Sequence, residues 1–302
     1  MTGQLEARIA AGLGVSVASQ VRGFAARLGE ESRALVVLFY GSNLRTGSLD
    51  GVIDYYVLVP GEAERGVWPR VSYREWTDAG MPLRAKVATV TLEKFREAAS
   101  GALIDTTIWA RFVQPSALVW QRDEAAGHAV AESLAAACQT AARLAAIVGP
   151  DQGREEDYWS ALFRATYSAE FRIESSGREQ SILTLNAQHF EGLFPLALEA
   201  AGIEFERIDD LFAPRIAAAE RARIERWWRK RRMLGKPLNV LRLLRAASTF
   251  DGAARYAAWK VERHTGVKIA LTPWRERHPI LSAPAVLFSL WRAQRKGRAN
   301  QR

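Results

Sequence analysis

Cysteine is almost absent from this chain of 302 residues, in which Cys138 stands alone. One cysteine excludes a disulfide framework and a thiolate metal site, and it indicates a reducing, cytosol-like compartment. The four histidines also lack the spacing of metal ligands. Long apolar runs are missing as well, because no segment approaches the roughly 20 apolar residues that span a bilayer. The sequence therefore predicts neither a membrane span nor a metal site built from Cys and His.

Acidic residues are scarce in the last third of the chain. Residues 201–302 contain 23 Lys and Arg against 9 Asp and Glu, a net charge of +14, whereas residues 1–200 contain 19 against 24, a net charge of −5. The overall charge of +9 therefore comes from the last third alone. Such a basic segment indicates an anionic partner, and nucleic acid, an anionic membrane surface and phosphorylated metabolites all fit. With 48% hydrophobic and 25% charged residues, wholesale disorder is excluded.

Hydrophobic patterning predicts an α/β part followed by a helical part. Apolar residues at helical spacing over 5–28 predict one helix that ends at Gly29. Short apolar runs bounded by Gly, Pro and polar residues predict strands at 34–40, 52–59, 85–92, 106–113 and 117–120, with a short helix at 93–100. From about Asp123 the spacing is helical, which predicts helices at 124–148, 155–173, 181–201, 214–234 and 238–248.

These elements predict an α+β fold, with a mixed sheet in an N-terminal α/β domain and an all-α C-terminal domain. Composition changes near Asp123, and a Gly- and Pro-rich turn follows at 149–153. We expect domains at 1–122 and 123–278, and a basic amphipathic tail at 279–302 that associates with a membrane.

One predicted strand end carries a pattern suited to phosphate chemistry. The strand at 34–40 is followed by Gly41-Ser42, and Asp54 lies at the start of the next strand. Gly41 lets the backbone turn and approach a ligand closely, while the Ser42 hydroxyl and nearby amides can donate hydrogen bonds to phosphates. Asp54 can hold a Mg²⁺ ion that bridges those phosphates. An ordinary turn explains these few residues equally well, so the pattern alone leaves both interpretations open.

The pattern resembles the signature of the DNA polymerase β nucleotidyltransferase superfamily, in which Gly-Ser is followed by Asp-x-Asp, although Tyr56 stands where the second acid is usual. It is more similar to the mitochondrial translocator assembly and maintenance family of phosphatidate cytidylyltransferases, which has Tyr-Gly-Ser and one acid. Here these are Tyr40-Gly41-Ser42 and the segment 53–57. Three further segments resemble that family in the same order, namely 109–115, 167–172 and 186–190.

The resemblance implies roles for individual residues. Tyr40, Gly41 and Ser42 would bind the nucleotide, Asp54 would hold Mg²⁺ or Mn²⁺, and Arg111 would contact phosphate, with Ser42, Asp54 and Arg111 acting in catalysis. A second metal ligand is expected at Asp50 or Asp105. Gln114 stands where that family usually has Lys, and Arg84 and Lys86 are the nearest residues that could replace its charge. The residues expected in the cleft are Glu170, Arg172, Asn186 and His189.

Purely structural roles are the alternative for several of these residues. Glu170 and Arg172 fit a solvated or domain-bridging ion pair on a helix as well as a cleft. His189 fits a structural histidine packed between helices even better, and Asn186, one turn earlier, shares that uncertainty.

Tryptophan and arginine occur together in the basic third. Aromatic and aliphatic residues beside Arg and Lys are typical of helices that lie at bilayer interfaces. A solvated basic face around buried tryptophans and a nucleic-acid surface are the alternatives. The residues expected to contact the membrane are Trp227, Trp228, Arg229, Lys230, Trp291, Arg292 and Arg295.

The resemblance implies a phosphatidate cytidylyltransferase, which transfers CMP from CTP to phosphatidic acid and releases pyrophosphate. We expect Mg²⁺ or Mn²⁺ as the cofactor, CTP and an anionic lipid as partners, no nucleic acid, and a cytoplasmic, bacterial location at the inner face of a membrane. The alternatives are a transferase of the same fold with another phospho-lipid or nucleotide, and an inactive relative that binds lipid or nucleic acid.

Overall fold

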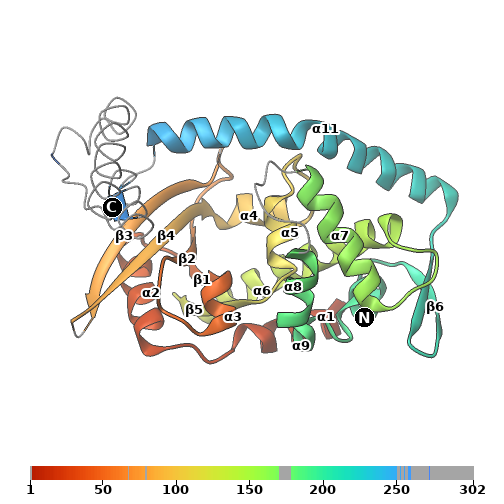
Figure 1. Cartoon of the computed structure of the whole chain (residues 1–302), viewed down its shortest axis with the longest axis horizontal. Helices are drawn as coiled ribbons and strands as arrows, with labels where there is room; N and C mark the ends of the chain where they lie inside the picture. Colours follow the sequence, from red (N-terminus) through yellow and green to blue (C-terminus); the bar gives the residue numbers. More distant parts are fainter. Residues whose placement is uncertain are drawn as a thin grey trace, which may run out of the picture.

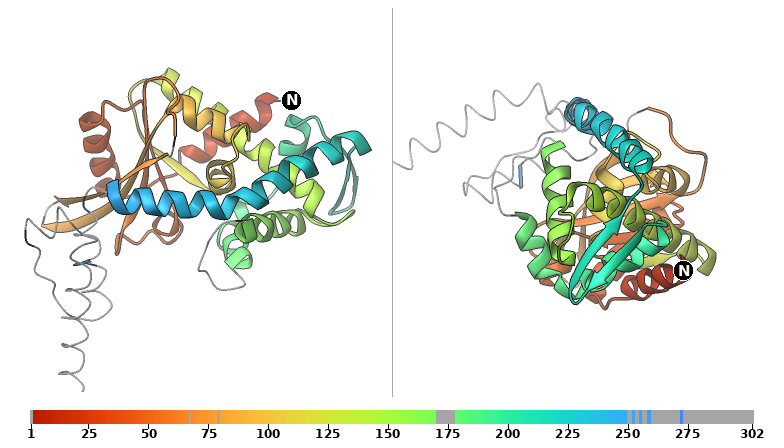
Figure 2. Two further views of the ribbon diagram at one scale, coloured as in Figure 1. Left: turned by 90° about the horizontal axis from the view of Figure 1, so that it is seen from above. Right: turned by 90° about the vertical axis from the view of Figure 1, so that its right-hand side faces the viewer.

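The computed structural model describes residues 2–66, 68–78, 80–169 and 178–249, together with Gly252, Arg255, Ala258, Trp259 and Thr272. A five-stranded sheet occupies one end of the elongated molecule and a group of helices the other (Figure 1). The long helix α11 (Ala218–Thr249) runs along one side from the helical end to the sheet (Figures 1 and 2).

The sheet is mixed, as the sequence predicts. Its strand order is β3-β4-β2-β1-β5, in which β2 and β4 are parallel and the other neighbours are antiparallel. Short apolar runs form its central strands because both faces of the sheet are covered. The strands are β1 (Val36–Tyr40), β2 (Ile53–Val59), β3 (Arg70–Asp78), β4 (Met81–Thr91) and β5 (Ser116–Gln121).

Helices cover the two faces of the sheet unequally. On one face, Phe24 of α2 packs against Tyr55 of β2 with ring centroids 5.8 Å apart. The other face is covered by a larger buried cluster that includes residues of α4, α5 and α6. The helices before β6 are α1 (Thr2–Leu13), α2 (Ser19–Glu31), α3 (Ser42–Thr46), α4 (Leu92–Ala99), α5 (Thr107–Phe112), α6 (Glu124–Val148), α7 (Glu155–Ala169), α8 (Arg178–Leu185), α9 (Ala187–Phe190) and α10 (Leu193–Ala200).

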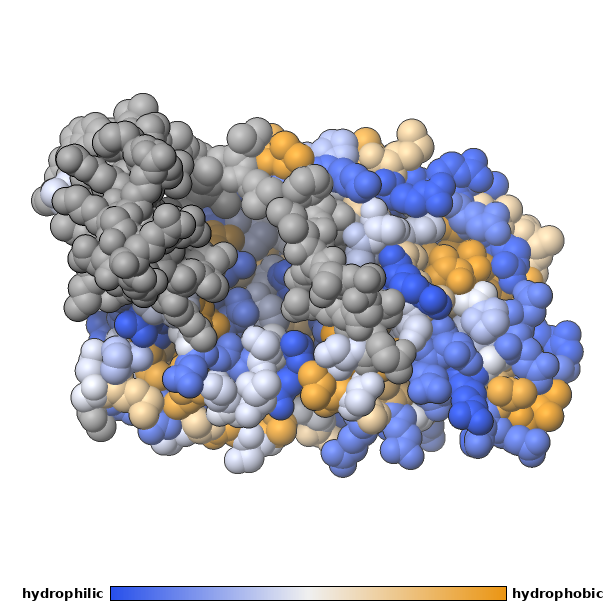
Figure 3. All heavy atoms as spheres, in the orientation of Figure 1, coloured by the Kyte–Doolittle hydropathy of each residue, from blue (hydrophilic) through white to orange (hydrophobic). Residues whose placement is uncertain are grey.

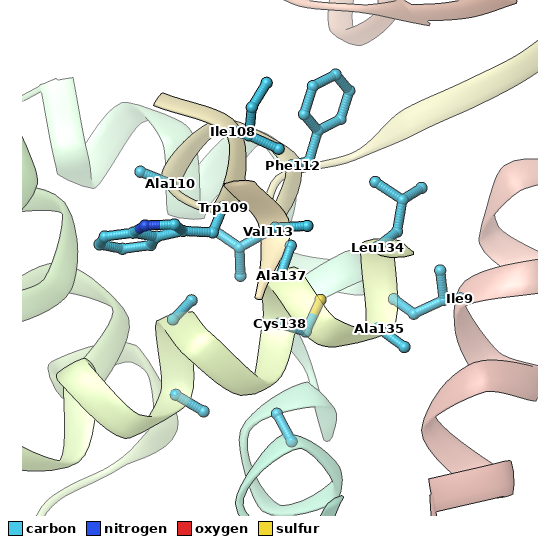
Figure 4. Close-up of a cluster of buried hydrophobic side chains, with 14 of the residues drawn as sticks. Ile9, Ile108, Trp109, Ala110, Phe112, Val113, Leu134, Ala135, Ala137 and Cys138 are labelled. Carbon is cyan, nitrogen blue, oxygen red and sulfur yellow. The ribbon is translucent and has the colours of Figure 1, made fainter. Parts of the chain in front are cut away.

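Helix α6 lies at the centre of the larger cluster. Its many alanines let neighbouring elements approach closely, and its side chains lie beside Val113 at the end of α5 and Ile9 of α1 (Figure 4). This cluster continues across residue 122, because Leu38 of β1 and Leu144 of α6 both belong to it. Burial of apolar surface on this scale is the main stabilising contribution to such a fold.

The strand expected at 106–113 is wrong, because this segment forms α5. Its apolar residues read as a strand in isolation, but Trp109 and its neighbours are buried against α6 and the sheet, and tertiary packing outweighs β propensity. The Asp105 carboxylate also accepts a hydrogen bond from the Thr107 amide at 2.9 Å, which satisfies one of the amide donors at the start of α5.

Other expected helices have different boundaries. The helix expected at 5–28 is two helices separated at 14–18, and the one expected at 181–201 is divided into α8, α9 and α10. Gly192, with a φ of +69°, precedes α10 in a conformation that favours glycine.

The helical part also contains strands that the sequence patterns do not predict. Pro214, expected in a helix, lies in β7 (Leu211–Arg215), which pairs with β6 (Glu204–Ile208) in a hairpin. The helices expected at 214–234 and 238–248 are one helix, α11, which continues through Pro237. Across the residues that the structure describes, every helix is too short or too polar to cross a bilayer.

Candidate active site

The Gly-Ser motif and Asp54 meet where β1 ends and β2 begins. Tyr40, the last residue of β1, is the register partner of Asp54, and Asp54 is in turn the partner of Lys86 on β4. Alternate residues of a strand share one face, so Asp54 lies on the same face of the sheet as Tyr56. Three neighbouring strands thus bring a carboxylate, an ammonium group and two tyrosines together.

Gly41 cannot be replaced by another residue without strain. Its backbone has a φ of +91° and a ψ of −160°, a conformation that is essentially restricted to glycine. A Cβ atom at this position would lie 3.0 Å from Oδ2 of Asp54. Gly41 therefore permits both the sharp turn into α3 and the close approach of the Asp54 carboxylate.

Opposing effects act on the pKa of the Asp54 carboxyl group. Burial raises the pKa of its carboxyl group above the ordinary value of 3.8, while the positive charges of Lys86 and Arg111 lower it in part. Two cations, Lys86 and Arg111, thus act on this carboxylate. Cationic side chains of this kind can contact phosphate, and the carboxylate beside them can bind a cation.

Arg111 reaches this cluster from the last turn of α5. Its guanidinium carbon lies 5.3 Å from the ring centroid of Tyr40 and 5.9 Å from that of Tyr56. Its Nη1 donates a long hydrogen bond of 3.4 Å to the Tyr56 hydroxyl. Tyr56, two residues after Asp54 on β2, thus holds an arginine beside that carboxylate. Burial raises the pKa of both tyrosine hydroxyls, so they remain protonated at neutral pH.

The second metal ligand expected at Asp105 is not supported by its surroundings. The Asp105 carboxylate forms an ion pair with Arg242 of α11 and accepts hydrogen bonds from Thr107. Asp50, the other candidate, is exposed in the loop after α3. Within the described ranges, no three Asp, Glu, His or Cys side chains gather as a metal site. Asp54 alone fits a metal ion only if ligand oxygens, such as those of phosphates, complete the coordination.

The remaining charges near the motif are partly engaged. Arg84 lies two residues before Lys86 on β4, with its Nε 3.7 Å from the Glu75 carboxylate and its guanidinium 5.5 Å from the Trp259 ring. Ser42, the first residue of α3, is exposed.

The sequence patterns did not single out Asn43, which is buried. Its Nδ2 donates to the main-chain oxygens of Ser48 and Asp50, so Asn43 shapes the loop between the motif and β2.

Three further residues from the sequence motifs line one cavity beside this cluster. Gln114, Asn186 and His189 contribute to a cavity of about 670 Å³ whose other walls include α1 and α3. His189 donates its Nε2 proton to the Val113 main-chain oxygen at 2.9 Å, and burial lowers the pKa of its imidazole. Its structural role between α5 and α9 is therefore evident, and the same side chain also faces ligand-sized space.

The membrane-facing role expected for Trp227 and Trp228 disagrees with their positions. Both rings lie close to Trp109, with centroids 5.7 Å and 6.4 Å away, and the Trp227 indole donates to the Gly101 oxygen at 3.0 Å. They are part of the core, and Arg229 and Lys230 are exposed beside them. The predicted residues that lie outside the described part of the chain are Glu170, Arg172, Trp291, Arg292 and Arg295, with the tail 279–302.

Arg242 is a residue near the site that sequence reasoning treated only as part of a basic helix. It pairs with Asp105 at the start of α5, and its guanidinium lies 4.8 Å from the Trp68 ring. Because Arg111 lies at the other end of α5, this contact ties α11 to the element that carries Arg111. The one sequence signal at Arg242 is the helical spacing of Leu and Arg around it.

The sequence matches neither a protein-family model nor a curated protein. The resemblance to phosphatidate cytidylyltransferases consequently rests on the motifs of this chain.

Proposed function

We propose that the protein is a Mg²⁺-dependent nucleotidyltransferase that transfers CMP from CTP to phosphatidic acid. The observation that carries the proposal is the position of Asp54, whose carboxylate closely approaches Gly41 and is subject to the charges of Lys86 and Arg111. One carboxylate with two cations suits a metal–nucleotide complex, in which the phosphates bring both negative charge and metal-binding oxygens.

In this proposal each residue of the cluster has a distinct task. Lys86 and Arg111 would neutralise the phosphates, and the Ser42 hydroxyl would donate a hydrogen bond to them. Tyr40 and Tyr56 would hold the Arg111 guanidinium in place through their rings. Mg²⁺, held by Asp54 and phosphate oxygens, would supply charge neutralisation at the reacting phosphorus.

The reaction itself needs little proton transfer. A phosphate oxygen of phosphatidic acid would attack the α-phosphorus of CTP, and the bond from that phosphorus to the bridging oxygen would break, so pyrophosphate leaves with the electron pair. The attacking phosphate monoester is already ionised near neutral pH, so no general base is required. Positioning and charge neutralisation are sufficient, which agrees with a cluster of arginine, lysine and a single carboxylate.

An anionic lipid surface is the proposed location of the reaction, because of the outward face of α11. No Asp or Glu occurs between Glu225 and Asp251, and Lys230 and Lys236 are exposed on the helix. Four apolar side chains of the same helix are 40–69% exposed, namely Met233, Leu234, Val240 and Leu241. Apolar and strongly polar residues alternate along this side of the molecule (Figure 3). Cations beside exposed apolar groups suit anionic lipid better than nucleic acid, which needs no apolar stripe.

The test is a panel assay with the purified chain. Pyrophosphate release is measured with Mg²⁺, each of the four common nucleoside triphosphates and either phosphatidic acid or another phospho-lipid. We expect release with CTP and phosphatidic acid. Release only with another nucleotide and lipid pair would support a transferase of the same fold with a different substrate. No release with any pair would refute the enzyme and favour an inactive relative that binds lipid or nucleic acid.

A further inference from the structure

The cavity lined by Gln114, Asn186 and His189 begins where the candidate active site ends. Phe112 lines the cavity, and its ring lies 5.6 Å from that of Tyr40. Ser116 also lines it and is the register partner of Tyr40. Arg45, which also lines the cavity, belongs to the same short helix as Ser42. The cavity therefore adjoins the residues of the cluster.

The size and walls of the cavity suit a nucleoside. Its volume of about 670 Å³ is within the usual range of small-molecule sites. Leu44, Phe112 and Leu185 provide apolar contacts of the kind that cover the faces of a base. Polar side chains also line the cavity, from α1, from α3, from the segment between α5 and β5, and from α9 with its N-cap, and such groups can fix the orientation of a ligand.

Three polar side chains of this cavity, Gln114, Asn186 and His189, share one chemical property. Each uses an N–H group to donate to a main-chain carbonyl oxygen, so each retains an acceptor atom: Oε1 of Gln114, Oδ1 of Asn186 and Nδ1 of His189. The low pKa that burial gives His189 keeps its imidazole neutral and Nδ1 unprotonated at neutral pH. The donors and acceptors are Gln114 Nε2 to Ala110 O at 3.2 Å, Asn186 Nδ2 to Ile182 O at 2.6 Å, and His189 Nε2 to Val113 O at 2.9 Å.

We propose that this cavity holds the nucleoside of the substrate and that the acceptor atoms of Gln114, Asn186 and His189 select cytosine over uracil. Cytosine carries an exocyclic amino group with two N–H donors at the position where uracil carries a carbonyl oxygen. Acceptors facing that position bond to the amino group and repel the carbonyl, and a buried unpaired acceptor costs more than a formed bond gains. The inference rests on the proposed function, since it assigns the base subsite of that same site.

The test measures binding, so it does not depend on turnover. Isothermal titration calorimetry with the full chain and Mg²⁺ compares CTP, UTP and inorganic tripolyphosphate, which has no base. Gln114→Leu removes the amide, and His189→Phe removes Nδ1 together with the donor to Val113. The matched controls are Gln152→Leu and His128→Phe, at exposed positions away from the cavity. Leu185→Trp narrows the cavity from a side chain that is 59% exposed, so it preserves the fold.

We expect the wild type to bind CTP more tightly than UTP. Gln114→Leu and His189→Phe should each weaken CTP binding by about 3- to 10-fold, the loss of one neutral hydrogen bond to the ligand, and reduce the preference for CTP over UTP. Leu185→Trp should weaken binding of both nucleotides. All three variants should bind tripolyphosphate as the wild type does, and both controls should match the wild type throughout.

Two results would overturn the inference while the proposed function stands. One is an unchanged ratio of the dissociation constants for CTP and UTP in the variants. The other is a variant that binds CTP as the wild type does but has a higher KM for the lipid, which would assign the cavity to acyl chains. Failure of the wild type to bind both CTP and tripolyphosphate would instead refute the proposed function, and the inference with it.

Discussion

Oδ2 of Asp54 lies 3.0 Å from the point that a Cβ atom on Gly41 would occupy. The last residue before Gly41, Tyr40, is paired in register with Asp54, so the strand pairing fixes this approach. The glycine of the motif is therefore required by the carboxylate of the motif, and the two residues form one structural unit.

A Gly41→Ala variant should lose activity and stability together. The substitution brings a methyl group against Asp54 and forces alanine into a glycine conformation, which costs about 1–3 kcal/mol in the free energy of unfolding. Gly47→Ala is the matched control, since Gly47 has a φ of +67° but nothing within 4 Å of an added Cβ. Urea unfolding and pyrophosphate release measure the two effects. Equal loss of activity in both variants would show that the Asp54 contact is unimportant.

The raised pKa of Asp54 predicts a pH-dependent stability difference. Because burial raises the pKa of the folded state above the ordinary 3.8, ionisation of Asp54 opposes folding. The wild type therefore loses stability as pH rises through the folded-state pKa of this group. Asp54→Asn should be more stable than the wild type at neutral pH, and this advantage should disappear below pH 3.8. Urea unfolding across this pH range checks the prediction, and a less stable variant at neutral pH would contradict it.

Arg231 joins α11 to the segment before α5 from within the core. It is 3% exposed, donates to the main-chain oxygens of Gly101 and Leu103, and lies 3.8 Å from the Trp227 ring centroid. Arg231→Met leaves two carbonyls without their donor and should lower the free energy of unfolding by about 3 kcal/mol. Arg232→Met, at an exposed neighbour, should change it by less than about 0.5 kcal/mol. Similar changes in the free energy of unfolding for both variants would show that the hydrogen bonds of Arg231 contribute little to stability.

The outward face of α11 predicts which apolar residues matter for lipid binding. The double variant Met233→Ser and Leu241→Ser should bind vesicles rich in anionic lipid about 10-fold more weakly, because it removes two side chains that would enter the interface. Ile208→Ser is the control, since Ile208 is 55% exposed on the β6–β7 hairpin, away from the basic helix. Cosedimentation with vesicles provides the measurement. An equal effect of the control, or none of the double variant, would assign the surface elsewhere.

Local patterns predicted the central strands and the Gly41–Asp54 motif because both depend on short segments. Contacts between distant segments could not be predicted in this way. The strand expected around Trp109 is a helix because α6 and Trp227 surround it, and Trp227 was expected at a membrane because burial between helices leaves no local signal. Strand β3 escaped prediction since its residues are mostly polar and only partly buried. The pairing of Arg242 with Asp105 joins residues far apart in the chain.

Labelled CTP tests the proposed transfer of CMP to phosphatidic acid most directly. Purified protein, Mg²⁺ and phosphatidic acid are incubated with CTP labelled at the α-phosphate or at the γ-phosphate, and the lipid is then extracted. We predict that the α-label enters the lipid and the γ-label is released as pyrophosphate, and that Asp54→Asn, shown to be folded by urea unfolding, does neither. Lipid that stays unlabelled with the wild type, or that is labelled equally by Asp54→Asn, would contradict the assignment of this site.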